Sequence, residues 1–340
     1  MENHINDKRY SLEDLPENVA KFYRSVPFPH DYATNFKSIK EFARQCQLSH
    51  SKTILITSGG TIVPIEKNMV RYLDNFSGGG RGAATAEYFL EHGYHVLFLY
   101  RKNSLQPFIR HLMLHDTNFF TFLSYNPEQH LAYVSDTYKE QVSNLFMKWK
   151  SYIDSGRLLR VHFETVGEYL YYLRASTIEL STLKRNMIIF AAAAVSDFYI
   201  PLDQMSEHKI QSKNEGLTIN LDPVPKLLKL VVSEWAPDAY TVSFKLETDI
   251  NILDAKCQTS LNSYHHQLVI GNLLSDYKNW VVFHTPSKPA MYIRKTEQQI
   301  KDHVDIEPMI GERLKDLHRI YCDHPPHTTT NHNHNHHQQN

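Results

Sequence analysis

Clustered glycines mark where this chain could hold an anion. The chain has 12 glycines, and six of them lie between Gly59 and Gly82. Two of the six end a short apolar run that predicts a buried strand, and four precede a helical pattern: Gly59 and Gly60, then Gly78, Gly79, Gly80 and Gly82. Exposed N–H groups at a helix N-terminus bind phosphate or carboxylate. Because Arg71 and Arg81 flank the second group as planar donors, the pattern favours anion binding over a purely structural turn.

A second strand end carries small residues and one acid. Ala191–Ala194 follow the apolar run 187–190, and Asp197 comes three residues later. Small side chains let a ligand approach the backbone closely, and a carboxylate accepts hydrogen bonds from hydroxyl or amide groups. An Asp that caps the next segment explains the same pattern. The residues alone leave both interpretations open.

Three further residues are candidates at later positions. Lys209 lies in a long segment between a strand and a helix, where a mobile loop could bring its charge to a transferring phosphate. Phe244 ends a predicted strand and could stack on a nucleobase, and Asn272 follows another strand and could offer an amide. The simpler interpretations are a solvated lysine, a core aromatic and a turn.

Composition and missing motifs exclude several classes of protein. The charges nearly balance, with 36 Lys+Arg against 37 Asp+Glu, so nucleic acid is not an expected partner. No apolar run has the length needed to span a bilayer, and the three cysteines form no CxxC pair. The dinucleotide fingerprint GxGxxG and the Walker pattern GxxxxGK[ST] are absent. With a polar N-terminus, we expect a cytoplasmic protein, with the nucleus as an alternative location.

Alternating strands and helices must position these residues. The apolar run 53–57, the helical pattern 82–92 and the run 94–100 predict a strand–helix–strand unit. Further predicted strands are 161–163, 187–191, 240–244, 268–270, 280–283 and 290–293, and predicted helices are 166–183, 224–234, 250–263 and 297–321. This alternation predicts an α/β fold with a single doubly wound, mostly parallel, Rossmann-like sheet flanked by helices.

The rest of the chain divides around this sheet. Residues 1–50 predict an N-terminal helical extension packed on the core of residues 51–321. Within that core we expect an insert at about 101–157, containing a helix over about 128–153, and an active-site flap at about 200–225. Residues 322–340 are rich in His and Asn and should be disordered.

The motifs in this order resemble those of phosphopantothenoylcysteine synthetases of the eukaryotic, ATP-using type. The resemblance covers residues 36–321 and rests on TSGGT at 57–61, RYLDNFSGGGRG at 71–82, AAAVSDFY at 192–199, HKIQS at 208–212 and VSFKLETD at 242–249. It implies joining of 4′-phosphopantothenate to L-cysteine in coenzyme A biosynthesis. The acid would attack the α-phosphate of ATP, which is bound with Mg²⁺, to give an acyl-adenylate that the amine of cysteine then attacks.

The resemblance also implies roles for individual residues. The nucleotide is expected at Gly59, Ser77, Gly79, Gly82, Phe244 and Asn272. Phosphopantothenate is expected at Asn75, Ala193, Ala194 and Asp197, with Arg71 reaching in from the other subunit of a homodimer. Asn75 would hold the acyl-adenylate and donate to the oxyanion, and Lys209 would support nucleotidyl transfer. No protein metal ligand is implied.

Two positions depart from the family pattern. Gly78 replaces a serine and Gly80 a basic residue, so a hydroxyl and a cation are missing from the expected phosphate loop. Because the backbone N–H groups remain, we expect nucleotide binding to survive. The alternatives are a dinucleotide-dependent oxidoreductase and a non-catalytic scaffold subunit of a coenzyme A-synthesising complex.

Overall fold

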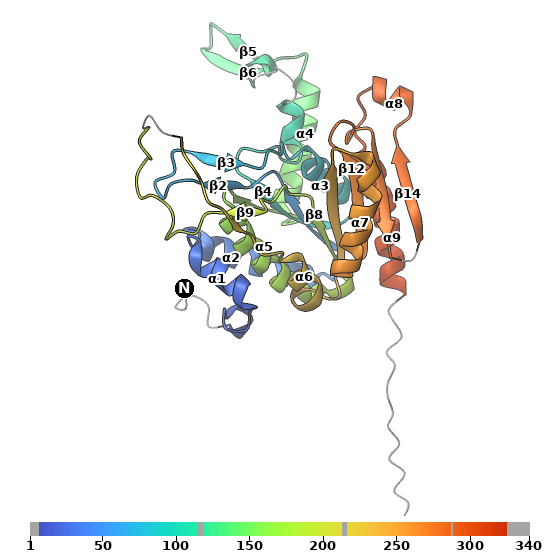
Figure 1. The fold of residues 1–340 in the computed structure, drawn as a ribbon. Helices are drawn as coiled ribbons and strands as arrows, with labels where there is room; N and C mark the ends of the chain where they lie inside the picture. The colour runs from blue at the N-terminus through green and yellow to red at the C-terminus, as the bar shows by residue number, and fades with distance from the viewer. Residues whose placement is uncertain (1–6, 114–118, 213–215, 287, 325–340) are drawn as a thin grey trace, which may run out of the picture.

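An eight-stranded sheet forms the centre of the chain (Figure 1). In this computed structural model, residues 7–113, 119–212, 216–286 and 288–324 are described. Six strands of the sheet run parallel, and two antiparallel strands extend one edge. The parallel strands are β1 (Thr53–Ser58), β4 (His95–Arg101), β7 (Leu158–Phe163), β8 (Met187–Ala191), β11 (Tyr240–Glu247) and β12 (Leu268–Leu273), and the antiparallel ones are β13 (Trp280–Thr285) and β14 (Lys288–Arg294).

The order of the strands confirms the predicted fold class. The parallel strands lie side by side as β7-β4-β1-β8-β11-β12, which is 3-2-1-4-5-6 in chain order. This is the order of the doubly wound fold, in which the chain leaves β1 in one direction and later returns to its other side. Ligands of such folds bind at the carboxyl ends of the strands where the order reverses. That point lies between β1 and β8.

Helices cover both faces of the sheet because each strand is apolar on both sides. Ile54 and Ile56 of β1 pack with α3 (Gly80–Glu91) and α9 (Glu307–Asp323), and Leu55 packs on the opposite face. That opposite face is covered by helices from two parts of the chain: α1 (Glu17–Ser25), α2 (Tyr32–Leu48) and α5 (Val166–Leu180). Next to them, α7 (Ile250–Tyr264) packs on β11 and β12.

Short strands gather near the carboxyl edge of the sheet. Two antiparallel pairs lie there, β2 (Ile62–Pro64) with β3 (Tyr72–Asp74) and β9 (Phe198–Tyr199) with β10 (Asp222–Pro223). Isolated bridges join Gly60 to Ala194 and Glu66 to Ser206. The predicted flap at about 200–225 therefore starts from β9, and its described part runs beside the β2–β3 hairpin. After β10 the chain forms the short α6 (Leu228–Leu230) and one π-helical turn, residues 231–235.

The insert after β4 forms an arm that leaves the body of the molecule (Figure 1). It contains a hairpin of β5 (Leu123–Asn126) and β6 (Leu131–Val134), followed by α4 (Lys139–Asp154). The expected helix over about 128–153 is therefore wrong in its first part, where the chain pairs as a strand. At the root of the arm, Arg110 donates to both carboxylate oxygens of the buried Glu87 in α3, each at 2.9 Å.

The C-terminal helix also differs from its prediction. Instead of one helix over 297–321, the chain forms α8 (Glu297–Lys301) and then α9. His303, with φ +53°, adopts a left-handed conformation that interrupts the helix between them. In the part of the chain that the structure describes, no helix combines the length and the apolarity needed to cross a membrane. The predicted disordered tail falls almost entirely outside the described residues, and the division at residues 50 and 321 stays a prediction.

Candidate active site

Residues from β1 and β8 meet directly at the point where the strand order reverses. The N–H of Ala194 donates to the carbonyl of Gly59 at 2.8 Å, and the N–H of Thr61 donates to the carbonyl of Ala194 at 3.0 Å. The N–H of Ala193 donates to Thr57 Oγ1 at 3.1 Å. The two predicted ligand-binding strand ends are therefore one continuous surface.

The N-terminus of α3 lies against the end of β1. Gly79, with φ +80°, is the residue that caps α3, and its carbonyl accepts a hydrogen bond from Ser58 Oγ at 3.0 Å. A β-carbon built on Gly82 would lie only 2.4 Å from Ser58 Oγ, and one built on Gly59 (φ +85°) would lie 2.7 Å from Arg101 Cβ. Glycine is needed at these positions because a β-carbon would collide with Ser58 or Arg101. We call Gly59, Gly60, Gly79 and Gly82 the glycine cradle.

Asn75 lies beside the glycine cradle. Its N–H donates to the carbonyl of Thr61 at 3.1 Å, which brings the segment after β3 onto the end of β1. A β-carbon on Gly60 would lie 1.6 Å from the carbonyl oxygen of Asn75 and 3.2 Å from the nitrogen of Ser77. The structure therefore brings Asn75 and Ser77 together with Gly59 and Ala194, as expected for one site.

Asp197 forms an ion pair that the sequence did not predict. Its carboxylate accepts from Lys226 Nζ, and its carbonyl accepts from the N–H of Val224 at 2.9 Å. Strand β9, rather than a helix, follows Asp197, so the capping interpretation is wrong. The carboxylate remains well exposed, at 67%. Lys226 comes three residues after the strand that pairs with 198–199, and this long-range pairing has no signal in the local sequence.

Arg71 ties the described part of the flap to the β2–β3 hairpin. Its guanidinium donates to the carboxylate of Glu66 at 2.5 and 2.9 Å and to the carbonyl of Ile210 at 2.7 Å. Burial acts to raise the pKa of Glu66, but the hydrogen bonds from Arg71 outweigh it and hold that pKa below its ordinary value. Lys209 precedes Ile210 and is exposed, so this anchor fixes the backbone next to the predicted flap lysine.

Arg81 does not have the anion-binding role that its sequence position predicts. It donates to the carbonyl of Tyr277 at 2.7 Å, pairs with Glu307 at 3.3 Å, and lies over the ring of Phe244. Burial lowers the pKa of this guanidinium. The predicted base-stacking residue Phe244 also contacts Phe190, with ring centroids 5.0 Å apart. Arg81 therefore supports one face of Phe244 instead of facing a phosphate.

The strand register shows where Phe244 and Asn272, the two remaining residues expected to bind the nucleotide, lie along the sheet. Thr57 and Ser243 both pair with Ala191, so Phe244 lies one residue beyond that level at the carboxyl edge. Asn272 pairs with Leu246 farther along the same edge and is buried. Both residues thus belong to the edge that carries the glycine cradle, on the β11–β12 side of β8.

The loop after β4 contributes to the same edge, although none of its residues was predicted to belong to the site. Arg101 donates to Asp74 at 2.6 Å and covers Gly59, and Ser104 lies between the two loops of the cradle. The sequence feature that could have identified Arg101 and Ser104 is their position at the carboxyl end of a predicted parallel strand that neighbours β1.

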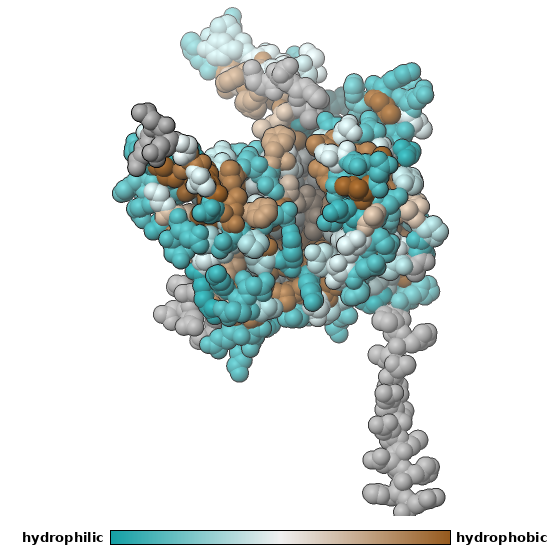
Figure 2. All heavy atoms as spheres, in the orientation of Figure 1, coloured by the Kyte–Doolittle hydropathy of each residue, from teal (hydrophilic) through white to brown (hydrophobic). Residues whose placement is uncertain are grey.

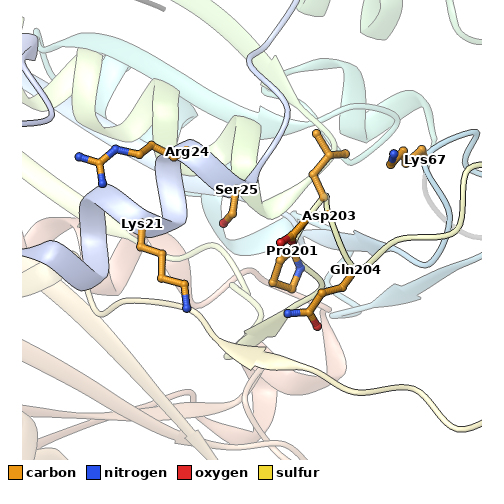
Figure 3. Close-up of a pocket in the computed structure, with 8 residues that line it drawn as sticks. Lys21, Arg24, Ser25, Lys67, Pro201, Asp203 and Gln204 are labelled. Atoms are coloured by element: carbon orange, nitrogen blue, oxygen red, sulfur yellow. The ribbon is translucent and has the colours of Figure 1, made fainter.

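An open cavity of about 520 Å³ lies elsewhere, between α1 and the chain that follows β9 (Figure 3). None of the predicted site residues lines it; its lining is Lys21, Arg24, Ser25, Lys67, Pro201, Leu202, Asp203 and Gln204. The candidate active site is therefore defined by the convergence of backbone and side chains at the sheet edge, and this cavity is separate from it.

Comparisons with known proteins decide the family. The model of the DNA/pantothenate metabolism flavoprotein C-terminal domain matches residues 49–114 and 175–306. Phosphopantothenate–cysteine ligase 1 of Oryza sativa subsp. japonica is 40% identical over 266 residues, which are 78% of this chain and 80% of that protein. The chain belongs to the phosphopantothenate–cysteine ligase family. The match omits residues 115–174, which hold most of the arm.

Other members match over a larger share of the chain. The ligase CAB2 of Saccharomyces cerevisiae is 38% identical over 326 residues, covering 89% of this chain and 87% of its own. The human ligase is 36% identical over 306 residues, covering 89% and 96%. A Cab2 mutant solved in complex with phosphopantothenate-cysteine superposes with a TM-score of 0.81 at 37% identity, covering 89% of this chain and 98% of that one.

Proposed function

We propose that this chain joins the carboxylate of 4′-phosphopantothenate to the amine of L-cysteine in coenzyme A biosynthesis, with ATP as the activating nucleotide. Membership of the ligase family supports the reaction. The observation that carries the assignment to this site is the convergence of the glycine cradle, Asn75 and Ala194 at the edge between β1 and β8, with Asp197 three residues farther along the chain. One surface can thus hold a phosphorylated nucleotide next to a second substrate.

The geometry suits a two-step reaction. A carboxylate resists attack by an amine, so it first attacks the α-phosphorus of ATP and releases pyrophosphate, giving an acyl-adenylate. The N–H groups at the start of α3 bind the negative phosphates. The amine of cysteine then attacks the acyl carbon and AMP leaves. The side-chain amide of Asn75 donates to the oxyanion formed in this attack, and Lys209 adds positive charge during nucleotidyl transfer.

We propose that Mg²⁺ enters with the nucleotide. In the described ranges, no group of three or more His, Cys, Asp or Glu side chains could hold a metal ion. Mg²⁺ keeps several waters and is commonly held by substrate phosphates with few protein ligands. The ion would offset negative charge on the triphosphate, and the backbone N–H groups of the cradle would orient that triphosphate.

We also propose a cytoplasmic homodimer that uses the β2–β3 hairpin as its interface. Apolar side chains cover this hairpin and the chain next to it, as the brown surface in Figure 2 shows. Five of them are at least 40% exposed: Met69, Val70, Tyr72, Leu73 and Phe76. Apolar area of this kind marks protein interaction sites. A partner on this face would lie close to Arg71, consistent with the expected contact of that residue across subunits.

The reaction is tested by its substrate requirements. Purified protein should release pyrophosphate only when phosphopantothenate and ATP are both present, and should release AMP and phosphopantothenoylcysteine when cysteine is added. Replacement of ATP by CTP in the same assay measures the nucleotide preference. A change in nicotinamide absorbance without pyrophosphate would favour the oxidoreductase. Turnover that appears only after another protein is added would favour the scaffold subunit.

A further inference from the structure

Ser104 has a buried hydroxyl group with nothing to bind. It lies in the turn after β4, where its own N–H donates to the carbonyl of Arg101 at 3.0 Å. Within the described part of the chain, its Oγ is inaccessible to solvent and has no hydrogen-bond partner. A buried hydroxyl without a partner destabilises the folded state, whereas alanine would fill nearly the same space without this cost. The position therefore carries a group that the free protein does not use.

The hydroxyl lies between both halves of the glycine cradle. A β-carbon on Gly59 would be 3.2 Å from Ser104 Oγ, and one on Gly79 would be 3.1 Å from it. The next residue is fixed to the same loop, because the N–H of Leu105 donates to the carbonyl of Gly78 at 3.0 Å. The turn after β4 is thus held onto the loop that opens α3, with the Ser104 hydroxyl at the junction.

Ser58 gives a useful contrast in the same place. It is also buried and lies near Gly79, but its Oγ donates to the Gly79 carbonyl at 3.0 Å. Ser58 therefore has a structural partner, and Ser104 has none. Two observations coincide at Ser104, an unpaired donor and the N-terminus of a 12-residue helix that attracts negative charge.

We propose that Ser104 donates a hydrogen bond to a phosphate oxygen of the bound nucleotide. Because its Oγ is inaccessible to solvent here while the residue as a whole is only partly buried, the side chain has to rotate toward the ligand to form this bond. The inference rests on the proposed function and adds a third segment, the loop after β4, to the phosphate site. A hydrogen bond to a charged acceptor is stronger than one between neutral groups. Ser104→Ala should weaken ATP binding about tenfold or more.

The test compares Ser104→Ala with Ser58→Ala and the unaltered protein. Thermal unfolding without ligand measures the structural role of each hydroxyl. Ser104→Ala should melt at the same temperature or higher, because an unsatisfied group is removed, whereas Ser58→Ala should melt lower. Titration calorimetry then measures the Kd of ATP, pyrophosphate, AMP and adenosine. In Ser104→Ala, ATP should bind more weakly while adenosine binds as before; a loss shared by AMP would place the contact at the α-phosphate, and one shared by pyrophosphate would place it beyond.

Two results would overturn the inference. An unchanged Kd for ATP in folded Ser104→Ala, with pyrophosphate release intact in the unaltered protein, would remove the role of Ser104 and leave the proposed function standing. If the unaltered protein neither binds ATP nor releases pyrophosphate, both fall. Should the alanine variant fail to fold, Ser104→Cys replaces it, since a thiol is a weak donor of similar shape; normal ATP affinity in that variant would also contradict the proposal.

Discussion

A single methyl group on Gly60 should disable the amide-forming step. The β-carbon of alanine at this position would lie 1.6 Å from the carbonyl oxygen of Asn75, and real β-carbons essentially never come closer than 3.0 Å to another atom. The two segments must therefore separate by at least 1.4 Å along this contact. The same separation stretches the hydrogen bond from the N–H of Asn75 to the carbonyl of Thr61, so Asn75 loses its position beside the cradle.

This displacement sets the expected size of the effect. A catalytic group misplaced by about 1 Å can lose about 100-fold in rate, or about 3 kcal/mol of transition-state stabilisation. Gly60→Ala should therefore slow formation of phosphopantothenoylcysteine about 100-fold. Rapid quenching of a single turnover separates this step from release of pyrophosphate, which we expect to be affected less. Circular dichroism and the melting temperature confirm that the variant is folded.

Gly78→Ala is the matched control. A β-carbon at Gly78 meets nothing within 4 Å, and this glycine is not among those with positive φ, so the variant should keep its activity. The double variant Gly60→Ala/Asn75→Ala should be no slower than Asn75→Ala, because both changes remove the same contribution. A folded Gly60→Ala protein within threefold of normal activity would refute the reasoning. So would a double variant in which the two losses multiply.

The remaining predictions concern catalysis and stability. Asn75→Ala should still release pyrophosphate but form little amide, and a variant unable to release pyrophosphate would show that Asn75 acts earlier. Lys209→Ala should slow pyrophosphate release about tenfold or more; an unchanged rate would exclude its role. Glu87→Gln removes one of the two carboxylates that pair with the buried Arg110, because Asp305 remains, and should lower the free energy of unfolding in urea by about 2 kcal/mol, with kcat unchanged. Burial lowers the pKa of His318 to about 4; unfolding lets it take up a proton, so stability should fall as pH drops from about 6.5 to about 4, and His318→Asn should remove that part of the change.

The sheet and its edge could be predicted because their signals are local. A strand buried on both faces is a continuous apolar run, as in residues 53–57 and 187–191, and parallel strands bring their carboxyl ends to one edge. The sequence alone therefore predicts that Gly59 and Ala194 lie close together. The glycines of the cradle were equally informative, since their spacing reflects backbone contact that side chains would prevent.

The pairing of side chains could not be predicted from the sequence, because the paired residues lie far apart along the chain. Arg81 and Arg71 both flank the glycines in sequence, but Arg81 turns to Glu307, which comes more than two hundred residues later. Lys226 reaches Asp197 only because β9 and β10 pair across the predicted flap. The second strand of the hairpin, 131–134, was mistaken for the start of a helix, since it is mostly exposed and lacks the buried period that identifies a sheet strand.

The arm is attached to the body of the molecule at two places. Glu87 lies on the helix whose first turn belongs to the glycine cradle, and it clamps Arg110 where the arm begins. At its other end the arm rejoins the sheet as β7, the outer neighbour of β4. Helix α4 also packs against the body of the molecule through Leu145, Trp149, Tyr152 and Ile153, and its Lys148 pairs with Glu91 of α3 at 2.7 Å. Among the described elements of the arm, the β5–β6 hairpin is therefore the part that stands clear of the sheet and of the nucleotide loop.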